Sequence, residues 1–219
     1  MARFRTPELI PLIFIVIATA MLSGLGMWQI ERLQWKNALI ADITTAHAKP
    51  TLHAFSLEPY RRIEISGQWL PDKTMKVAGK PQFVEGQGYF RYTPLKLADG
   101  SILLVNRGWA PNDWSDPAPA QAHVTGILRP FRTKRLFTPE NHPEHNLWLH
   151  EDQPAMEVYS GLTLKHLILE ATGERKSETY PYPSDGKISL RNDHLGYAIT
   201  WFSLAFIGIF MFVAYHRKP

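Results

Sequence analysis

The sequence predicts an α+β membrane protein in which two transmembrane helices flank a small antiparallel β-rich domain, shaped as a barrel or sandwich. Residues 9–28 and residues 195–215 contain no formal charge. Each run is long enough to cross about 30 Å of hydrocarbon as a helix that rises about 1.5 Å per residue. Between the runs, short strand-like stretches alternate with Pro- and Gly-containing turns, which is typical of antiparallel sheets.

Composition excludes several classes of protein. The chain of 219 residues has no cysteine, which excludes a disulfide framework, a Cys-based zinc site and a thiolate copper site. The net charge of +4 lies mostly in the two tails, whose charged residues are Arg3, Arg5, Arg217 and Lys218 against Glu8. Basic tails indicate the cytoplasmic side of a membrane. No basic face interleaved with aromatic residues indicates nucleic acid as a partner.

These patterns divide the chain into five parts. We expect a cytoplasmic tail at 1–8, a transmembrane helix at 9–29, an extracytoplasmic β-rich domain at 30–194, a transmembrane helix at 195–215 and a cytoplasmic tail at 216–219. The N-terminal run also resembles a cleavable signal peptide. It continues beyond Ala20 to Trp28, where a cleaved signal would give way to polar sequence, so an uncleaved anchor is favoured.

The first helix is expected to continue beyond the membrane to about Thr44 or Ala46, because no Gly or Pro interrupts the sequence after the apolar run. Trp28, Arg32 and Trp35 recur at helical spacing in this extension. Aromatic rings and long cations are at home among lipid headgroups. This stripe therefore predicts an interfacial anchor.

Close contact between the two membrane helices is expected at Ala20 and Gly24. These residues form a small-xxx-small pair, which lets the backbone of a second helix come near. The second apolar run is the obvious neighbour, because the chain returns to the same membrane.

The middle of the chain begins with strand-like sequence. The first strand is expected around residues 63–69, with residues 74–78 pairing with it across the turn at Pro71 and Asp72. Asp99 and Gly100 predict a hairpin turn. The further expected elements are strands at 88–97, 101–109, 123–128 and 164–170, a short helix at 154–160 that ends at Gly161, and a connection at 187–190 into the second membrane helix.

Four short sequence motifs follow one another along nearly the whole chain. They are Leu25–Arg32 with Trp35 and Lys36, Val105–Pro111, Phe137–Asn141, and Leu190–Tyr197 with Thr200 and Trp201. Together they resemble the surfeit-locus protein family of cytochrome c oxidase assembly factors. The resemblance implies a non-enzymatic, multi-pass protein of the bacterial inner (plasma) membrane, with its soluble domain in the periplasm.

The same resemblance implies a function. It points to an assembly factor that binds or positions haem a for insertion into subunit I of a haem-copper oxidase. Haem a synthase is a further partner that it suggests. The family's histidine at the start of the second span is implicated in binding haem a, and that role carries over to His194 as a ligand of the haem iron. The alternative is a cofactor-free scaffold that stabilises an oxidase subunit during assembly.

His194 stands where polar sequence gives way to the second apolar run. Haem a is strongly apolar and its iron takes a neutral imidazole nitrogen, so a donor facing lipid suits it. Tyr197, Trp201 and Ala205 fall near the same helical face and offer flat aromatic surface. The residues alone favour an interfacial histidine, hydrogen-bonded to a headgroup or to the soluble domain. The family resemblance favours a ligand.

Two other clusters of side chains, one of histidines and one of basic residues, are candidate binding sites. The histidines at 142, 145 and 150 lie close enough in sequence for copper or zinc, as in a copper-delivery protein, or they form a solvated loop. The second cluster is a basic run of Arg129, Arg132, Lys134 and Arg135. One interpretation is that it contacts haem propionates or an acidic oxidase surface, and the other is that it forms a solvated loop.

A structural role is expected for the segment from Arg107 to Trp109. Arg107 is expected to be paired at a strand end, and Trp109 is expected in the core. No nucleophile elbow, Gly-rich phosphate loop or acid–base pair indicates an enzyme.

Overall fold

In the computed structural model, the chain comprises two compact units. The structure describes residues 8–79, 81, 84–115, 120–134, 136–174, 179–186 and 192–217. The first unit, here called the helix pair, contains Met1–Asp42 and Ser189–Pro219, and the second, the β-domain, contains Ile43–Ile188. The expected connection at 187–190 lies outside the described residues.

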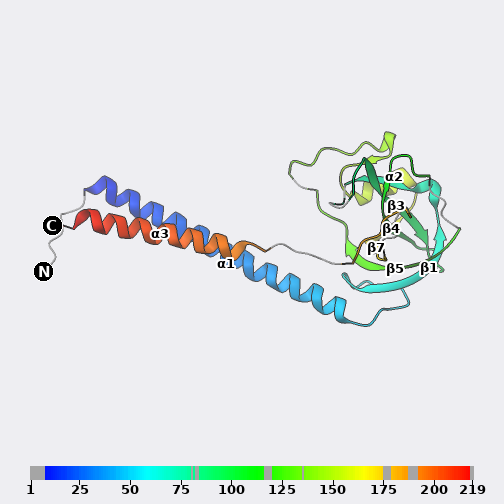
Figure 1. The fold of residues 1–219 in the computed structure, drawn as a ribbon, viewed down its shortest axis with the longest axis horizontal. Coiled ribbons are helices and arrows are strands. Elements are labelled where there is room, and N and C mark those ends of the chain that lie inside the picture. The colour runs from blue at the N-terminus through cyan, green and yellow to red at the C-terminus, as the bar shows by residue number, and fades with distance from the viewer. Residues whose placement is uncertain are drawn as a thin grey trace. The chain divides into compact units, whose positions relative to one another are not determined.

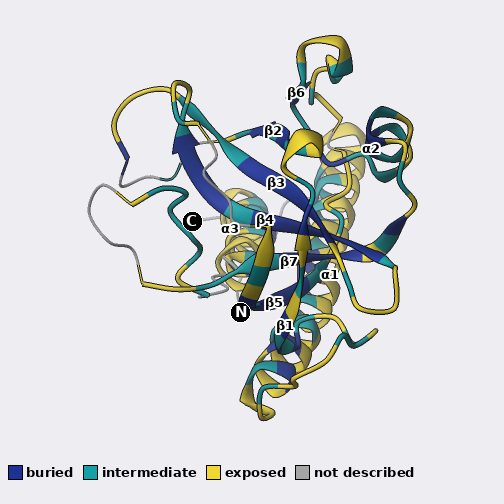
Figure 2. Cartoon of the chain, turned by 90° about the vertical axis from the view of Figure 1, so that its right-hand side faces the viewer, coloured by how far each residue is buried: buried dark blue, intermediate teal, exposed yellow. Residues whose placement is uncertain are grey.

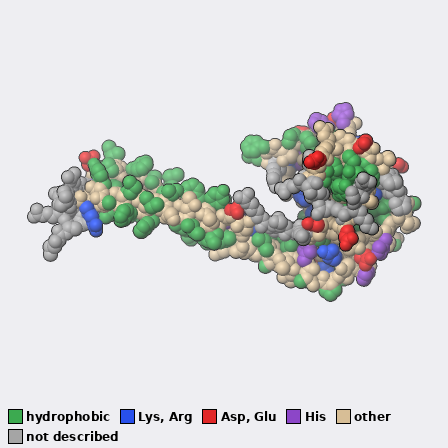
Figure 3. Space-filling model, in the orientation of Figure 1, with side chains coloured by type: hydrophobic (Ala, Val, Ile, Leu, Met, Phe, Trp, Pro, Cys, Tyr) green, Lys and Arg blue, Asp and Glu red, His purple; other side chains and the backbone are tan. Residues whose placement is uncertain are grey.

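The helix pair is built from α1, Leu9–Ala48, and α3, His194–His216 (Figure 1). Both helices are long and apolar enough to cross a membrane. Only 6% of the most apolar stretch of α1 and 11% of that of α3 is buried. Most residues of the pair are exposed (Figure 2), and hydrophobic side chains cover much of its outside (Figure 3). A core helix of a soluble protein would bury them, so this exposure suits lipid.

α1 continues without a break beyond the charge-free run that ends at Trp28. Its 40 residues end at Ala48, close to the predicted end at Thr44 or Ala46. About 30 Å of its roughly 60 Å length is therefore polar helix beyond the apolar part.

The β-domain consists mainly of one sheet. Its strands are β1 (Arg62–Trp69), β2 (Met75–Ala78), β3 (Gly88–Lys96), β4 (Ile102–Pro111), β5 (Gln121–Pro130), β6 (Leu147–Trp148) and β7 (Leu164–Ala171). Their order is β1-β5-β7-β4-β3-β2-β6. β1 also pairs with β3 through Trp69 and Leu95, so strands β1, β5, β7, β4 and β3 close into a five-stranded barrel.

The predicted barrel is confirmed, but its sheet is mixed rather than wholly antiparallel. β7 pairs antiparallel with β5 and parallel with β4, and β2 and β6 are also parallel. Strands in a closed ring of five cannot all alternate in direction, so one parallel pair is unavoidable. The parallel pair is β4 and β7. The chain reaches β7 from β5 by a long connection that contains α2, Gln153–Ser160.

The expected pairing of residues 74–78 with the first strand is wrong. Pro71–Lys73 forms a single 3₁₀ turn, in which the Thr74 N–H donates to the Pro71 carbonyl. The chain therefore kinks there instead of reversing. β2 continues in the direction of β1 along the same edge of β3, where Met75 lies opposite Tyr92.

The remaining strands and the short helix agree with the sequence predictions. β3 and β4 form the hairpin around Asp99 and Gly100, and β4 lies between β7 and β3 in the barrel. Asp152 caps α2 by accepting a hydrogen bond from the Ala155 N–H at 3.1 Å, and Gly161 ends the helix at φ 68°.

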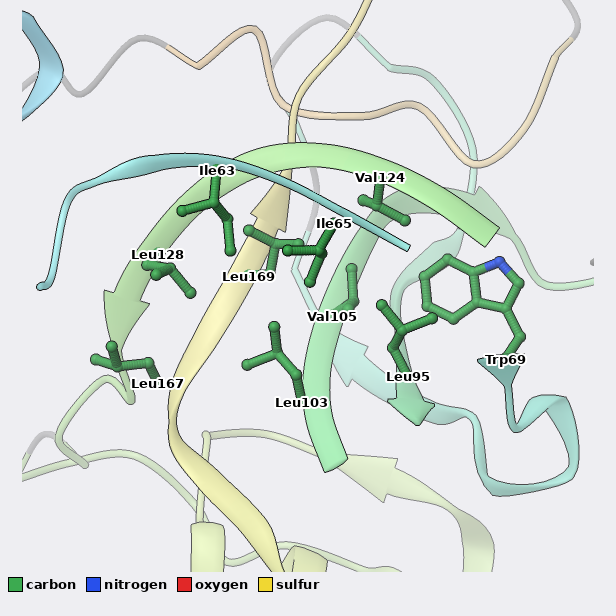
Figure 4. Packing of buried hydrophobic residues seen from close by; sticks show 10 residues of the cluster. All are labelled: Ile63, Ile65, Trp69, Leu95, Leu103, Val105, Val124, Leu128, Leu167 and Leu169. Atoms are coloured by element: carbon green, nitrogen blue, oxygen red, sulfur yellow. The ribbon is translucent and has the colours of Figure 1, made fainter. Parts of the chain in front are cut away.

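The barrel interior is filled by aliphatic side chains from all five strands and by Trp69 (Figure 4). Ile63, Leu95, Leu103 and Leu169 are wholly buried there. A second cluster, around Met75, Trp148 and Met156, packs α2 against the outside of the barrel. The domain therefore holds together without disulfides, by burial of apolar surface on both sides of the sheet.

One interpretation of the basic run, a solvated loop, is wrong for Arg129. Its side chain is only 11% exposed and lies within the β-domain. Its Nη1 and Nη2 donate to the two oxygens of Glu151 at 2.8 and 2.7 Å, and its Nε donates to Glu170 at 2.6 Å. Arg132 and Lys134 remain at the surface, and Arg135 lies outside the described residues.

Further hydrogen bonds complete this buried network. The Tyr92 hydroxyl donates to Glu151 at 2.7 Å, and the Asn106 amide donates to Glu170 at 3.1 Å. Burial opposes ionisation of Glu151, but the hydrogen bonds and charge of Arg129 outweigh it and lower the pKa of that carboxyl. The carboxylate therefore stabilises the fold above its unfolded-state pKa, and this contribution is lost as the pH falls through the lowered value.

Arg129→Met tests the weight of this network. The substitution leaves Glu151 and Glu170 buried without their cation, which costs about 3–5 kcal/mol of unfolding free energy. Lys134→Met is the control, because Lys134 pairs with Glu140 at the surface, where such pairs contribute about 0–1 kcal/mol. Denaturant unfolding of the full chain in detergent measures both. Equal losses in the two variants would contradict the assignment.

Candidate functional site

The candidate site lies where α3 begins. His194 is the first residue of α3, and its Nδ1 is 2.7 Å from Oε1 of Gln29 on α1. Gln29 directly follows the charge-free run of α1 and is 8% exposed, while His194 is half-buried. The two helices thus bring together Gln29, which follows the apolar run of α1, and His194, which precedes that of α3.

The contact with Gln29 fits one tautomer of His194. With the Gln29 amide in this orientation its Oε1 accepts a hydrogen bond, and the neutral imidazole that satisfies it carries its proton on Nδ1. The lone pair is then on Nε2, which is the state of a histidine that can bind a metal. A ligating histidine ordinarily donates its other ring N–H to a protein oxygen in this way.

A second polar contact holds the start of α3. The Asn192 amide donates to Oδ1 of Asn37 at 2.8 Å, two turns further along α1 than Gln29. Asp193 occupies the N-cap position of α3, but its side chain forms no capping hydrogen bond. Two side-chain contacts between the helices therefore fix the first turn of α3 and the position of the imidazole.

The helices approach each other at Gly26, not at the predicted pair Ala20 and Gly24. A Cβ atom placed on Gly26 would lie 2.6–2.9 Å from the ring of Phe202, so a larger residue there requires that ring to move. Among the described residues, no heavy atom outside the helix lies within 4 Å of a Cβ placed on Gly24. The predicted small-xxx-small pair is therefore wrong. The contacting face of α1 is the one that also carries Gln29, about one turn from Gly26.

The contacting face of α3 contains Ala198 and Ala205, which are buried at 1% and 6% exposure. Both lie on the helical face of His194, as predicted for Ala205. Tyr197 lies at the edge of that face and is 55% exposed, while Trp201 is half-buried. Aromatic surface beside the imidazole remains a prediction for Tyr197 and Trp201.

Gln29 was missed as a functional candidate by reasoning from the sequence. It lies within a recognised motif and directly after the charge-free run. A polar residue at the end of one apolar run, facing an imidazole at the start of the other, was the available signal. The pairing itself depends on the register of the two helices, which no local pattern records.

The three clustered histidines do not form a metal site. Within the described parts of the chain, no group of three His, Cys, Asp or Glu side chains is arranged to hold a metal ion. His142 and His145 are exposed beside Glu144, whereas the side chain of His150 is 9% exposed and its Nε2 lies 3.3 Å from the Asn141 amide. The three imidazoles are therefore not gathered into one group.

A surface cluster on β1 and β5 brings together Ser66, His123 and Glu64. His123 lies 2.9 Å from the Ser66 hydroxyl and 2.5 Å from the Glu64 carboxylate, to which His53 also bonds at 2.9 Å. The side chains of His53 and His123 are 78% and 63% exposed. Water competes for every bond in this cluster, which is therefore a surface ion pair and not an activated nucleophile.

The Arg107–Trp109 segment is structural, as predicted, but Arg107 lies within β4 and not at a strand end. Trp109 is buried, and its backbone N–H donates to the Tyr182 carbonyl at 3.0 Å. Gly108 has φ 117°, and a Cβ there would lie 2.1 Å from the same carbonyl oxygen, so glycine is required. The Arg107 guanidinium stacks over the ring of Trp69 at 5.0 Å.

The Phe137–Asn141 motif divides between structure and surface. Asn141 accepts hydrogen bonds from the N–H groups of Leu149 and His150, which closes its loop. Phe137 is 91% exposed, and its neighbour Leu136 is 90% exposed. Packing within the β-domain does not explain these two side chains.

The fold and the site define a class of protein in which two apolar helices carry a mixed β-barrel, with one imidazole positioned at the boundary of the helix pair. The chain matches the sequence model of the SURF1 family over residues 16–206. It is 30% identical to a SURF1-like protein of Rickettsia conorii, over 94% of this chain and 91% of the relative. It is also 34% identical to one of Monosiga brevicollis, over 89% and 83%, and 32% identical to one of Drosophila melanogaster, over 88% and 73%.

The chain belongs to the SURF1 family. Membership implies a role in cytochrome oxidase assembly, and the family is generally non-catalytic.

Gly26→Ile tests the helix contact that positions His194. The larger side chain clashes with Phe202, and overpacking of this kind costs about 1–3 kcal/mol. The measurement is cross-linking between cysteines placed at Ile15 and Gly208, which are neighbours across the helix pair in a chain without native cysteine. We expect a lower yield in Gly26→Ile and an unchanged yield in the control Gly24→Ile. The same loss in both would refute the contact.

Proposed function

We propose that the protein binds haem a through His194 and positions it for insertion into subunit I of a haem-copper oxidase. The observation that carries the proposal is the hydrogen bond from His194 to Gln29. It leaves Nε2 of the imidazole with its lone pair, at a place where water gives way to an apolar surface.

The surroundings of His194 fit haem a. Its hydroxyethylfarnesyl tail needs an apolar environment, and the outside of α3 is apolar from Leu195 to Tyr215. Its iron accepts a neutral imidazole nitrogen, which the bond to Gln29 supplies. Its polar groups need water or cations, and the polar sequence Asn192–Asp193 stands on the other side of the imidazole from the apolar run. One amphipathic ligand thus matches one amphipathic boundary.

The proposed mechanism is transient ligation by a single histidine. Gln29 holds the imidazole in one orientation and one tautomer, so ordering of the ring costs little when the ligand arrives. A single bond from the protein to the iron allows release, after which the ligands of subunit I capture the haem. Binding by two histidines would oppose that transfer.

We also propose a location and partners. The basic tails favour the cytoplasmic side of a bacterial inner membrane, which puts the β-domain in the periplasm. Leu136 and Phe137 offer an exposed apolar pair on that domain, a feature typical of protein docking sites. Subunit I is the partner that the proposed function requires, and haem a synthase is the natural donor.

His194→Ala tests the function most simply. The full chain is purified in detergent from cells that make haem a, and its absorption spectrum is compared with that of the wild type. We expect haem a in the wild type and its loss from the variant, because the iron has lost its only protein ligand. Full retention of haem by His194→Ala would refute the ligand. Wild-type protein that captures subunit I but never contains haem would select the cofactor-free scaffold.

Substitutions at Gln29 test the role of the hydrogen bond. Gln29→Leu removes the acceptor, and loss of such a supporting contact weakens metal binding roughly 10- to 100-fold. Gln29→Glu keeps an acceptor for Nδ1–H and is expected to retain haem. Haem titration of the two purified variants measures this. Equal weakening in both, with the fold intact by thermal unfolding, would contradict the assigned tautomer.

A further inference from the structure

One motif on α1 is not used by the proposed function. Arg32 and Trp35 lie beyond Gln29 on the same helix, and the Arg32 guanidinium carbon is 5.0 Å from the centre of the Trp35 ring. Both side chains are exposed, Trp35 at 54%. The helix therefore presents a cation supported by an aromatic face to its surroundings.

The helix geometry puts this cation on the watery side of His194. Arg32 lies three residues, or about 4.5 Å, further along α1 than Gln29, and Trp35 about 9 Å further. The charge-free run of α1 extends in the opposite direction. A ligand whose iron is at His194 and whose apolar tail lies along the membrane would therefore direct its polar end toward Arg32.

The stacked guanidinium is well suited to bind a carboxylate. An arginine held on an aromatic face keeps its N–H edge available for two parallel hydrogen bonds. The stacking also lowers the entropy that is lost when the anion binds. Two acidic residues, Glu31 and Asp193, are neighbours of Arg32 and His194 in sequence. Without Arg32, their negative charge would repel an anionic ligand.

We propose that Arg32, held by Trp35, is a carboxylate-binding subsite of the His194 site and anchors the propionate groups of the porphyrin. This inference rests on the proposed function. The buried position of Arg129 supports it, because that arginine is saturated by Glu151 and Glu170 and has no free donor edge for a ligand. Arg32 belongs instead to the helix pair, together with His194.

The subsite determines specificity and not only affinity. A porphyrin with two free carboxylates gains the contact with Arg32, whereas its dimethyl ester carries no negative charge there. The iron, the ring and the contact with His194 are the same in both. The difference in affinity between the two ligands therefore isolates the contribution of the cation.

The experiment titrates full-length protein in lipid nanodiscs with haem a and with haem a dimethyl ester. We expect Arg32→Met to weaken haem a roughly 10- to 100-fold, the effect of losing a charge-assisted hydrogen bond, and to leave the ester unchanged. Arg32→Lys keeps the charge but not the paired geometry, so it is expected to fall between the two. Arg217→Met is the matched control, since that arginine lies at the other end of α3 and is expected to change neither ligand.

Several results would overturn the subsite. Equal weakening of acid and ester by Arg32→Met would show that Arg32 acts on the helix and not on the carboxylates. No change with either ligand would show that it does not contact the porphyrin. In both cases, loss of both ligands in His194→Ala would leave the proposed function standing. Failure of the wild type to bind either ligand would refute the proposed function and the subsite together.

Discussion

The hydrogen bond between His194 and Gln29 is the interaction on which the rest of the site depends. It joins the end of the apolar run of α1 to the start of that of α3 and so fixes these two positions beside each other. It also decides which imidazole nitrogen keeps a lone pair. Near Gln29, the ring of Phe202 lies against the backbone of Gly26 and brings α3 close to α1. Contacts between the two apolar helices therefore continue up to the His194 site.

The β-domain depends on the closure of its barrel and on a buried charged network around Arg129. Five strands close into a barrel, and this odd number forces one parallel pair between β4 and β7. Arg129 lies beside that pair and satisfies two carboxylates that would otherwise be buried alone. The motif residues of β4 serve the same end, with Asn106 bonded to Glu170 and Gly108 pressed against the Tyr182 carbonyl. These motifs therefore describe how the β-domain is built, while the motifs of the two helices form the proposed site at His194.

Much of the fold could be predicted from local patterns. Charge-free runs predicted α1 and α3, the turn at Asp99 and Gly100 predicted the β3–β4 hairpin, and Gly161 predicted the end of α2. Features that depend on distant contacts could not be predicted. The burial of Arg129 requires knowing that β5 lies beside β7, and the choice of Gly26 over Gly24 requires the rotation of α1 about its axis. His194 was found because a motif marks it, but its partner Gln29 emerged only from the helix register.

The central claim is that one imidazole, held by Gln29, is the sole protein ligand of the haem iron. The most direct measurement is resonance Raman spectroscopy of the reduced, haem-loaded protein in detergent. The account predicts a five-coordinate iron with one iron–histidine stretching band, which moves in frequency in Gln29→Glu because a carboxylate acceptor makes the imidazole more basic. A six-coordinate, low-spin spectrum from two histidines, or a band that does not respond to Gln29→Glu, would contradict it.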